Sequence, residues 1–261
     1  MHKLESQIYK SKLQTTSEEF KKNKESMLGM LEEIDDLLDE AEAGGGPDHQ
    51  KRLAARGKLP VRERVFNFLD PDSPFLEISG LAGYKSDYPV GGGAIAGIGV
   101  CCGVECIIFA NDPTVLAGAM HYYSVKKWMR SMAIARDCRI PFIQFVESAG
   151  GDLRPRGAMS AGAMGHFAES GRQFYEITEL SKLNIPTVTV TFGTATAGGA
   201  YQPGMSDYNI FVKDQADVAL AGPPLVQMAT GEISSREEIG GAKMHAEKSG
   251  LAEYLADDDL D

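Results

Sequence analysis

Basic charge is scarce in this sequence. Its 26 lysines and arginines are outnumbered by 37 aspartates and glutamates, which gives a formal net charge of −11 at pH 7. Nucleic acids and anionic membranes select basic surfaces, so neither is expected as a partner. An anionic substrate would need a local basic patch, although ordinary solvated charges are the alternative explanation for the same side chains. The candidates for that patch are Lys126, Lys127, Arg130, Arg154 and Arg156.

Several patterns that mark cofactor or metal sites are missing. The four cysteines have no CxxC spacing, so we expect reduced core thiols in a cytoplasmic protein rather than disulfides or a zinc site. The five histidines show no metal-ligand spacing, so no metal is expected. Gly97 and Gly99 are followed only by Gly103, which misses the dinucleotide fingerprint, and no GxxxxGK[ST] phosphate loop occurs. A nicotinamide cofactor and nucleotide hydrolysis are therefore not expected.

Targeting and membrane signals are also missing. No hydrophobic run reaches the length of a transmembrane helix. Residues 1–42 contain no arginine and no apolar secretory core, unlike a transit or signal peptide.

Apolar periodicity predicts an α/β fold. Strands that alternate with helices indicate βαβ units with right-handed crossovers. The first helix is expected to pack on its own domain or on a partner subunit. Helices are expected over 17–43, 49–68, 120–136 and 166–183, a hairpin over 94–100 and 104–110, strands over 140–146 and 185–192, and short apolar runs over 209–213 and 218–222.

Two glycine-rich turns are the most informative feature present. They lie in residues 145–152 and 191–201, each directly after a short apolar strand that opens with an Ile-Pro step. Glycines let backbone N–H groups approach a ligand, and a helix start that follows adds a positive dipole. Such amides hold a developing oxyanion with main chain alone, which points to acyl-thioester enolate chemistry. A single turn would be explained by chain reversal, but two similar turns favour function.

The amides of Ala149 and Gly150 are the best oxyanion-hole candidates in the first turn. In the second turn, Gly198 and Gly199 precede a helix start, with Pro203 tolerable in its first turn.

Side-chain catalysts are harder to identify. Glu147 is either a general base or a brace that accepts backbone hydrogen bonds. Tyr201 is either a donor that lines the pocket or a packed aromatic. Ser148 lacks the GxSxG elbow, so a serine hydrolase is disfavoured. Main-chain stabilisers without an obvious base suit a reaction whose second substrate supplies the base.

From about Arg56 to Leu255 the chain resembles the carboxyltransferase (beta) subunits of biotin-dependent acyl-CoA carboxylases. Its motif sequences are most similar to those of the methylcrotonyl- and geranyl-type branch. The resemblance implies a crotonase-like (ClpP/crotonase) ββα superhelix over residues 47–261, preceded by an amphipathic helical segment over 1–46. The motifs that carry it are Arg56-Gly57-Lys58-Leu59, Asp70-Pro71-Asp72-Ser73-Pro74-Phe75, Gly91-Gly92-Gly93, Ala110-Asn111-Asp112, Glu147-Ser148-Ala149-Gly150-Gly151, Thr196-Ala197-Gly198-Gly199-Ala200-Tyr201, Ala221-Gly222-Pro223-Pro224-Leu225-Val226, Ala229-Thr230-Gly231-Glu232 and Ile239-Gly240-Gly241-Ala242.

The resemblance also implies a reaction and its components. Carboxybiotin, held on a separate carrier and loaded by a biotin carboxylase, would carboxylate an acyl-CoA in a homo- or hetero-oligomer completed by a C-terminal carboxyltransferase half. By position, the amides of Ala149 and Gly150 would hold the thioester enolate. The substrate-binding positions would be Gly151, Gly198, Gly199, Ala200 and Tyr201.

Two departures from the family pattern matter. The common Ser-Gly-Gly-Ala reads Ser148-Ala149-Gly150-Gly151 here, so the oxyanion hole shifts by one residue if position 149 needs a positive φ. The chain also stops where the family continues into a second half, which predicts a fragment or a split subunit. The alternatives are the carboxyltransferase component of a biotin-dependent acyl-CoA decarboxylase, or a non-catalytic acyl-CoA-binding or assembly subunit.

Overall fold

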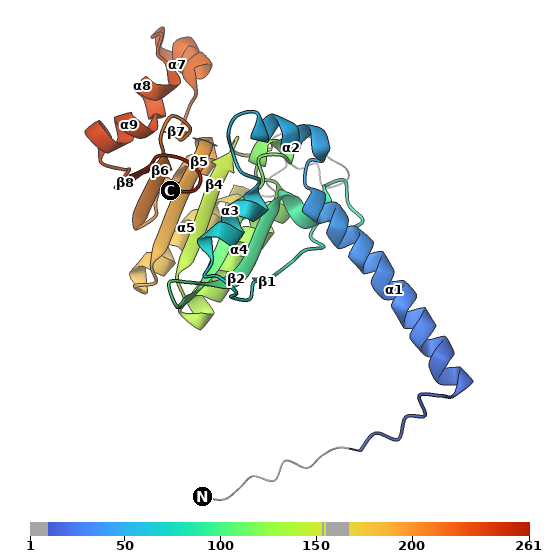
Figure 1. The fold of residues 1–261 in the computed structure, drawn as a ribbon. Coiled ribbons are helices and arrows are strands. Elements are labelled where there is room, and N and C mark those ends of the chain that lie inside the picture. The colour runs from blue at the N-terminus through green and yellow to red at the C-terminus, as the bar shows by residue number, and fades with distance from the viewer. Residues whose placement is uncertain (1–9, 153, 155–166) are drawn as a thin grey trace, which may run out of the picture.

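A mixed β-sheet forms the centre of the protein (Figure 1). The computed structural model describes residues 10–152, 154 and 167–261. Within them the strand order is β1-β2-β3-β4-β5-β6-β8, and β7 pairs with β5. The strands are β1 (Leu76–Glu77), β2 (Ala94–Cys101), β3 (Val104–Asn111), β4 (Phe142–Ser148), β5 (Thr187–Thr196), β6 (Tyr208–Val212), β7 (Asp217–Ala219) and β8 (Tyr254–Ala256).

The pairing of neighbouring strands changes once across the sheet, from antiparallel to parallel. β1, β2 and β3 pair antiparallel, and the hairpin expected over 94–110 is confirmed as β2 and β3. Asp70 caps its turn by accepting hydrogen bonds from the N–H groups of Cys102 and Gly103, at 2.6 and 2.7 Å. From β3 onward the neighbours β4, β5 and β6 pair parallel. Their carboxyl ends therefore meet along one edge of the sheet.

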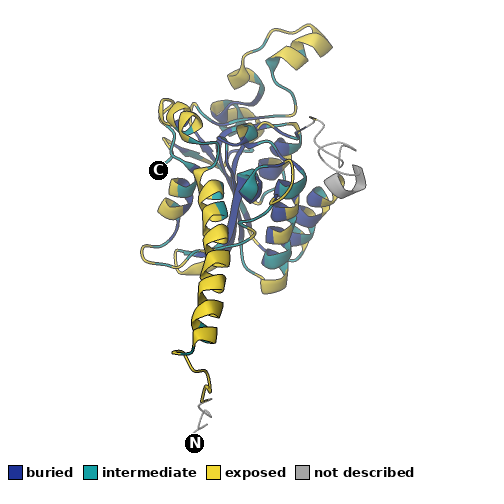
Figure 2. Cartoon of the chain, turned by 90° about the vertical axis from the view of Figure 1, so that its right-hand side faces the viewer, coloured by how far each residue is buried: buried dark blue, intermediate teal, exposed yellow. Residues whose placement is uncertain are grey.

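Helices cover both faces of the sheet. α4 (Tyr122–Cys138) and α5 (Phe167–Lys182) lie on one face, where Trp128 and Ile177 share a core with Phe109. α3 (Val61–Phe68) lies on the other face, where Val65 shares a core with Phe145. Figure 2 shows these buried layers on either side of the strands. Apolar burial on both faces explains why the central parallel strands read as continuous hydrophobic runs.

The single helix expected over residues 49–68 is wrong. The structure has α2 (Pro47–Ala54) and α3, with irregular chain between them. Gly57 adopts a positive φ of 75°, and Pro60 is the N-cap of α3. A left-handed glycine ends a helix and a proline starts one, so the basic stretch is divided.

α1 (Glu18–Ala43) projects from the body as a long helix (Figures 1 and 2). Ser17 caps its start by accepting a hydrogen bond from Phe20 N–H, and Gly44, with a φ of 57°, ends it. None of its residues is buried.

The carboxyl-terminal part adds short elements around the end of the sheet. In the described residues these are α6 (Tyr201–Gly204), α7 (Pro223–Thr230), α8 (Arg236–Gly240) and α9 (Ala242–Met244). No helix in the described part of the chain is long and apolar enough to span a bilayer.

Candidate functional site

The two glycine-rich turns lie side by side. They follow β4 and β5, which are parallel neighbours with Ser148 opposite Ala195. A Cβ added to Gly150 would stand 2.8 Å from the Thr196 carbonyl oxygen, and one added to Gly199 would stand 3.4 Å from the Ser148 side chain. A side chain at position 150 would force the turns apart, whereas one at position 199 would only reach van der Waals contact. The structure thus brings together the two turns that the sequence predicted separately.

The backbone of the first turn accommodates its alanine. The positive φ, 90°, is at Gly150, and Ala149 is not among the residues with positive φ. An alanine at position 149 is therefore unstrained. Its N–H donates to the Ala117 carbonyl at 3.1 Å, however, so this amide is already engaged within the protein. The Gly150 N–H donates to Ser148 Oγ at 3.2 Å, a hydroxyl that can rotate to another partner.

A third segment, not identified from the sequence, completes this edge of the sheet. The short 3₁₀ turn Leu116–Gly118 follows β3 and lies directly on the end of β4. A Cβ on Gly118 would stand 1.9 Å from the Glu147 carbonyl oxygen. Just after this turn, Met120 N–H donates to the Gly150 carbonyl at 2.7 Å, and its own carbonyl accepts from Asp152 N–H at 2.8 Å. The segment therefore fixes both ends of the first glycine turn.

The second turn is a short 3₁₀ helix, Ala197–Ala200, that runs into α6. The first N–H groups of such a helix have no acceptor within it. Apart from its chain neighbours, no heavy atom of the described residues lies within 4 Å of a Cβ built on Gly198. Ala200 is buried, whereas Tyr201 is 41% exposed. The Tyr201 ring also packs on Phe174, with ring centroids 4.6 Å apart, so both expectations for this tyrosine remain open.

Glu147 is held in a buried ion-pair network. Its carboxylate accepts from Lys58 Nζ at 2.6 Å and from Arg64 Nη1 at 2.9 Å. Arg64 also pairs with Asp259 at 2.9 Å, and its guanidinium lies 4.4 Å from the Phe192 ring centroid. Space for this carboxylate exists because residue 193 is glycine, where a Cβ would stand 2.6 Å from Glu147. Glu147 is thus a brace, but it accepts from side chains rather than from the backbone N–H groups we expected.

The proposed basic patch is wrong for Lys127. Its side chain is buried, and Nζ donates to the carbonyl oxygens of Gly91 and Ala94 at 3.2 and 2.7 Å. Burial lowers the pKa of this lysine to about 8. It fixes the glycine turn before β2 and does not face a ligand at the surface.

The other patch candidates differ in their surroundings. Arg154 pairs with the Asp152 carboxylate at 2.7 Å. Lys126 Nζ lies 4.4 Å from the Tyr122 ring centroid. Arg130 is exposed, and Arg156 lies outside the described residues.

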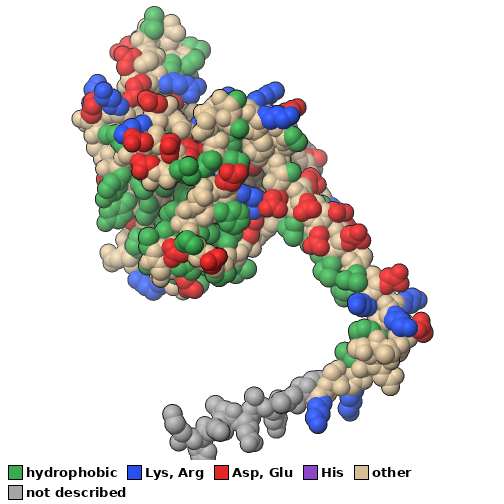
Figure 3. Space-filling model, viewed as in Figure 1, with side chains coloured by type: hydrophobic (Ala, Val, Ile, Leu, Met, Phe, Trp, Pro, Cys, Tyr) green, Lys and Arg blue, Asp and Glu red, His purple; other side chains and the backbone are tan. Residues whose placement is uncertain are grey.

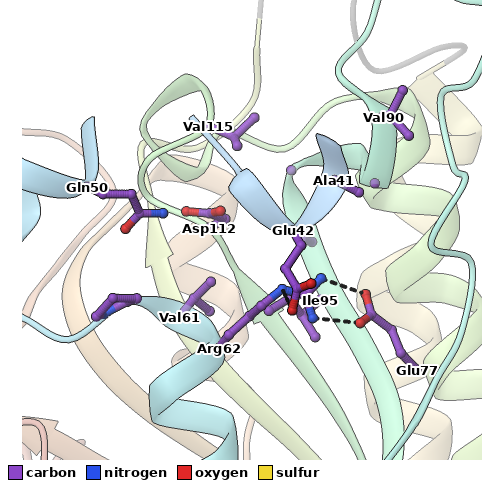
Figure 4. Close-up of a pocket in the computed structure, with 14 residues that line it drawn as sticks. Ala41, Glu42, Gln50, Val61, Arg62, Glu77, Val90, Ile95, Asp112 and Val115 are labelled. Atoms are coloured by element: carbon purple, nitrogen blue, oxygen red, sulfur yellow. Dashed lines mark hydrogen bonds and ion pairs between the residues drawn. The ribbon is translucent and has the colours of Figure 1, made fainter. Parts of the chain in front are cut away.

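A small cavity of about 70 Å³ lies beyond the end of β3 (Figure 4). Arg62 forms a bidentate ion pair with Glu77 along its wall, at 2.7 and 3.3 Å. Burial raises the pKa of Asp112, which accepts from the Thr114 N–H and hydroxyl. Thr114 Oγ1 in turn accepts from Gly45 N–H at 3.0 Å, which ties the end of α1 to β3. No residue of either glycine turn lines this cavity, so we assign it a structural role.

The described residues contain no group of three or more histidine, cysteine, aspartate or glutamate side chains able to hold a metal ion.

Comparison with known proteins identifies close relatives of this chain. A family model described as the carboxyl transferase domain matches residues 52–261. "Probable biotin-dependent acyl-coenzyme A carboxylase beta2 subunit" of Mycobacterium tuberculosis is 49% identical over 236 residues, which cover 90% of this chain and 43% of the relative. "Probable methylcrotonoyl-CoA carboxylase beta chain, mitochondrial" of Drosophila melanogaster is 40% identical over 262 residues, covering 99% of this chain and 45% of the relative.

Among solved structures, the geranyl-CoA carboxylase beta subunit of P. aeruginosa is similar, with a TM-score of 0.83 and 41% identity. The match covers 97% of this chain and 46% of that subunit. The chain therefore spans about half the length of the curated relatives it matches.

Proposed function

The chain belongs to the carboxyl transferase domain family, and from this premise we propose that it is the acyl-CoA half of a carboxyltransferase in a biotin-dependent acyl-CoA carboxylase. The crotonase-like α/β fold expected from the sequence is confirmed by the likeness to the geranyl-CoA carboxylase beta subunit. The observation that carries the proposal is the contact between the two glycine turns at the carboxyl ends of β4 and β5. Relatives at 49% and 40% identity are named as acyl-CoA carboxylase beta subunits, which supports the same assignment.

The proposed chemistry of this half is enolate stabilisation by main-chain amides. Loss of the α-proton of a thioester places negative charge on its carbonyl oxygen, and aligned N–H groups stabilise that charge. Ala149 and Gly150 were the expected donors. Since the Ala149 N–H is bonded to Ala117, we retain Gly150 and propose Gly198, in the second turn, as a further donor. Gly151, Gly199, Ala200 and Tyr201 remain proposed substrate contacts.

The rest of the reaction would come from outside this chain. Biotin on a separate carrier would supply the carboxyl group, and a C-terminal carboxyltransferase half would hold it. Glu147 is engaged by Lys58 and Arg64, which argues against this carboxylate as the proton acceptor. We also propose a homo- or hetero-oligomer that includes a biotin carboxylase and its carrier; a relative named as a subunit of a biotin-dependent carboxylase supports this.

We further propose that residues 47–261 form the carboxyltransferase domain and that residues 1–46 are an appended helical segment. The family match over 52–261 and the glycine turn that ends α1 support this division. The four free cysteines suit a reducing compartment, and we propose the cytoplasm, although the Drosophila relative is named as mitochondrial.

Reconstitution with a C-terminal half and carboxybiotin tests this function. We expect carboxyl transfer to a short acyl-CoA, and transfer to none would refute the proposal. Acyl-CoA binding without turnover would instead favour an assembly subunit, and activity confined to the reverse direction would favour a decarboxylase.

A glycine pair tests the placement of the site. Gly150→Val should lower turnover by roughly 100-fold or more, with a smaller loss of acyl-CoA binding by calorimetry. Gly103→Val is the matched control, because Gly103 also has a positive φ, 75°, but a Cβ there meets nothing within 4 Å. Equal loss of turnover in the two variants would contradict the placement.

A further inference from the structure

A series of hydrogen bonds joins α6, the helix that follows the second glycine turn, to the sheet. It starts at Trp128 of α4, whose Nε1 donates to Gln144 Oε1 on β4 at 2.9 Å. Gln144 Nε2 donates to Thr189 Oγ1 on β5 and to Ser206 Oγ, each at 3.2 Å. The two hydroxyl oxygens lie 2.6 Å apart, and Ser206 Oγ donates to the Gln202 carbonyl in α6 at 2.8 Å. This Gln144 network therefore ties α6 to both strands that carry the glycine turns.

The donors of the Gln144 network all point toward α6. Tryptophan can only donate, which places the oxygen of the Gln144 amide toward Trp128 and its nitrogen toward the hydroxyls. The single proton of Ser206 goes to the Gln202 carbonyl, so Thr189 is the donor between the two hydroxyls. Charged side chains lie over the surface of the body and along α1 (Figure 3), whereas every member of this network is neutral. Its strength therefore depends on hydrogen-bond geometry, and bonds that run in one direction reinforce one another.

The position of α6 determines the position of the second turn. α6 continues directly from that turn, and the Tyr201 N–H donates to the carbonyl groups of Gly198 and Gly199. A helix of four residues has little stability of its own. The Gln202 carbonyl also lacks the usual donor, because the N–H four residues later donates to another carbonyl. The Ser206 hydroxyl thus satisfies a carbonyl that the short helix leaves open, and fixes the helix by doing so.

α6 is held in a place that leaves polar side chains unsatisfied. The Gln202 side chain is fully buried, and among the described residues neither its oxygen nor its nitrogen has a hydrogen-bond partner. Thr191 Oγ1, on the same face of β5 as Thr189, is also buried without a partner in the described part of the chain. Buried polar groups without partners are destabilising, so other contacts must hold the backbone in this arrangement. The Gln144 network supplies such contacts.

We propose that Ser206 is a positioning residue for carboxyl transfer, which acts through the Gln202 carbonyl to hold the second glycine turn against the first. This inference rests on the proposed function, because it takes both turns as contacts of the acyl-CoA. The turns meet closely, since a Cβ on Gly199 would stand 3.4 Å from the Ser148 side chain. A misplacement of about 1 Å, even one caused far from the reacting atoms, can slow a reaction by about 100-fold. A weakened anchor should therefore slow turnover more than it weakens substrate binding.

Removal of the hydroxyl tests this role. Ser206→Ala should lower kcat and kcat/KM by the same factor, roughly 10-fold, and leave KM within about two-fold, because the turn acts on the enolate. Ser206→Thr keeps the hydroxyl and should restore most of kcat. Ser131→Ala is the matched control and should leave kcat unchanged. Ser131 is a buried serine whose hydroxyl also donates to the carbonyl four residues earlier, at 3.0 Å, but it lies in α4, which carries neither turn.

Amide hydrogen exchange of the same variants needs no catalytic activity. In a peptide that covers residues 197–205, Ser206→Ala should speed exchange by roughly 10-fold, because the local opening of the second turn becomes more favourable. Ser131→Ala should leave exchange in this peptide unchanged. If the wild-type chain transfers no carboxyl group in the reconstituted complex, the proposed function fails, whereas exchange still decides whether Ser206 holds the turn.

Three results would overturn the proposal. One is the same exchange in the second turn for Ser206→Ala and the wild type. Another is an equal loss of kcat in Ser206→Ala and Ser131→Ala, which would reflect lost stability rather than lost positioning. The third is a raised KM with unchanged kcat in Ser206→Ala, which would make the hydroxyl a contributor to substrate binding alone.

Discussion

Replacing Glu147 by glutamine distinguishes a structural carboxylate from a catalytic one. The side chain of Glu147 is 11% exposed, and that of Arg64 only 1% exposed. Removing one partner of a buried ion pair costs about 3–5 kcal/mol, because the other charge loses its compensation. Glutamine keeps one oxygen that accepts from Lys58. Its amide NH₂ group is a donor, however, and would face the donor groups of Arg64. Arg64 keeps Asp259, and Lys58 keeps the Phe192 carbonyl at 2.8 Å, so we expect a loss near the lower limit, about 3 kcal/mol.

Urea unfolding followed by circular dichroism measures this loss, and thermal unfolding should show a midpoint lower by roughly 6–12 °C. Glu77→Gln is the control, since the Arg62–Glu77 pair is partly exposed and should contribute no more than about 1 kcal/mol. Turnover per folded Glu147→Gln molecule should stay close to that of the wild type. The reasoning is refuted if this variant is no less stable than Glu77→Gln while turnover falls by about 100-fold, the loss expected for a general base.

Two further predictions concern the packing around the site. Gly118→Ala should lower the free energy of unfolding by about 3 kcal/mol or prevent folding, because its Cβ would stand 1.9 Å from the Glu147 carbonyl oxygen. Gly103→Ala is the control, since its Cβ would lie in open space, and it should cost only about 1 kcal/mol in the same urea titration. Lys127 should make stability rise between pH 8 and 10.5, since its folded pKa, about 8, lies below the unfolded value of 10.5 and the unfolded chain binds more protons in that interval. Lys127→Met should remove this rise in pH-dependent unfolding, and an unchanged slope would contradict the buried lysine.

Local patterns sufficed for much of the fold. Strands that open with Ile-Pro and end in glycine turns identified β4 and β5, and the similarity of the two turns favoured a functional role for both. The hairpin of β2 and β3 followed from alternating apolar runs around Gly103. These features depend on residues that are close together in the sequence, so they can be predicted from one sequence alone.

Long-range contacts account for the errors. Gly57 and Pro60 signal the break between α2 and α3 locally, but its consequence, the contact of Lys58 with Glu147 89 residues away, has no signal in the local periodicity. Lys127 was a candidate for a basic surface patch, but the carbonyl groups of Gly91 and Ala94 give it a buried site. Similarly, the Ala149 amide was expected to face a ligand, but the Ala117 carbonyl is its acceptor.

The turn before α4 shows why part of this site was invisible in the sequence. Leu116 and Ala117 adopt positive φ values of 52° and 55°, and Ala197 in the second turn has 52°. Each such non-glycine residue costs about 1 kcal/mol or more, so sequence rules place none of them there. Local strain of this size persists only where surrounding contacts fix the backbone.

Those contacts are the hydrogen bonds that join the segment to the first glycine turn, from Ala149 N–H to Ala117 and from Met120 N–H to Gly150. Strain and hydrogen bonds thus occur on the same few residues, at the edge where the two turns meet. A segment retained for stability alone would gain from glycine at position 117, where an exposed alanine has a positive φ. Ala117→Gly should therefore stabilise the protein by a few tenths of a kcal/mol up to about 1 kcal/mol, while turnover falls because the first turn is held less rigidly. Equal or higher turnover in this variant would show that the rigidity of the segment does not serve the reaction.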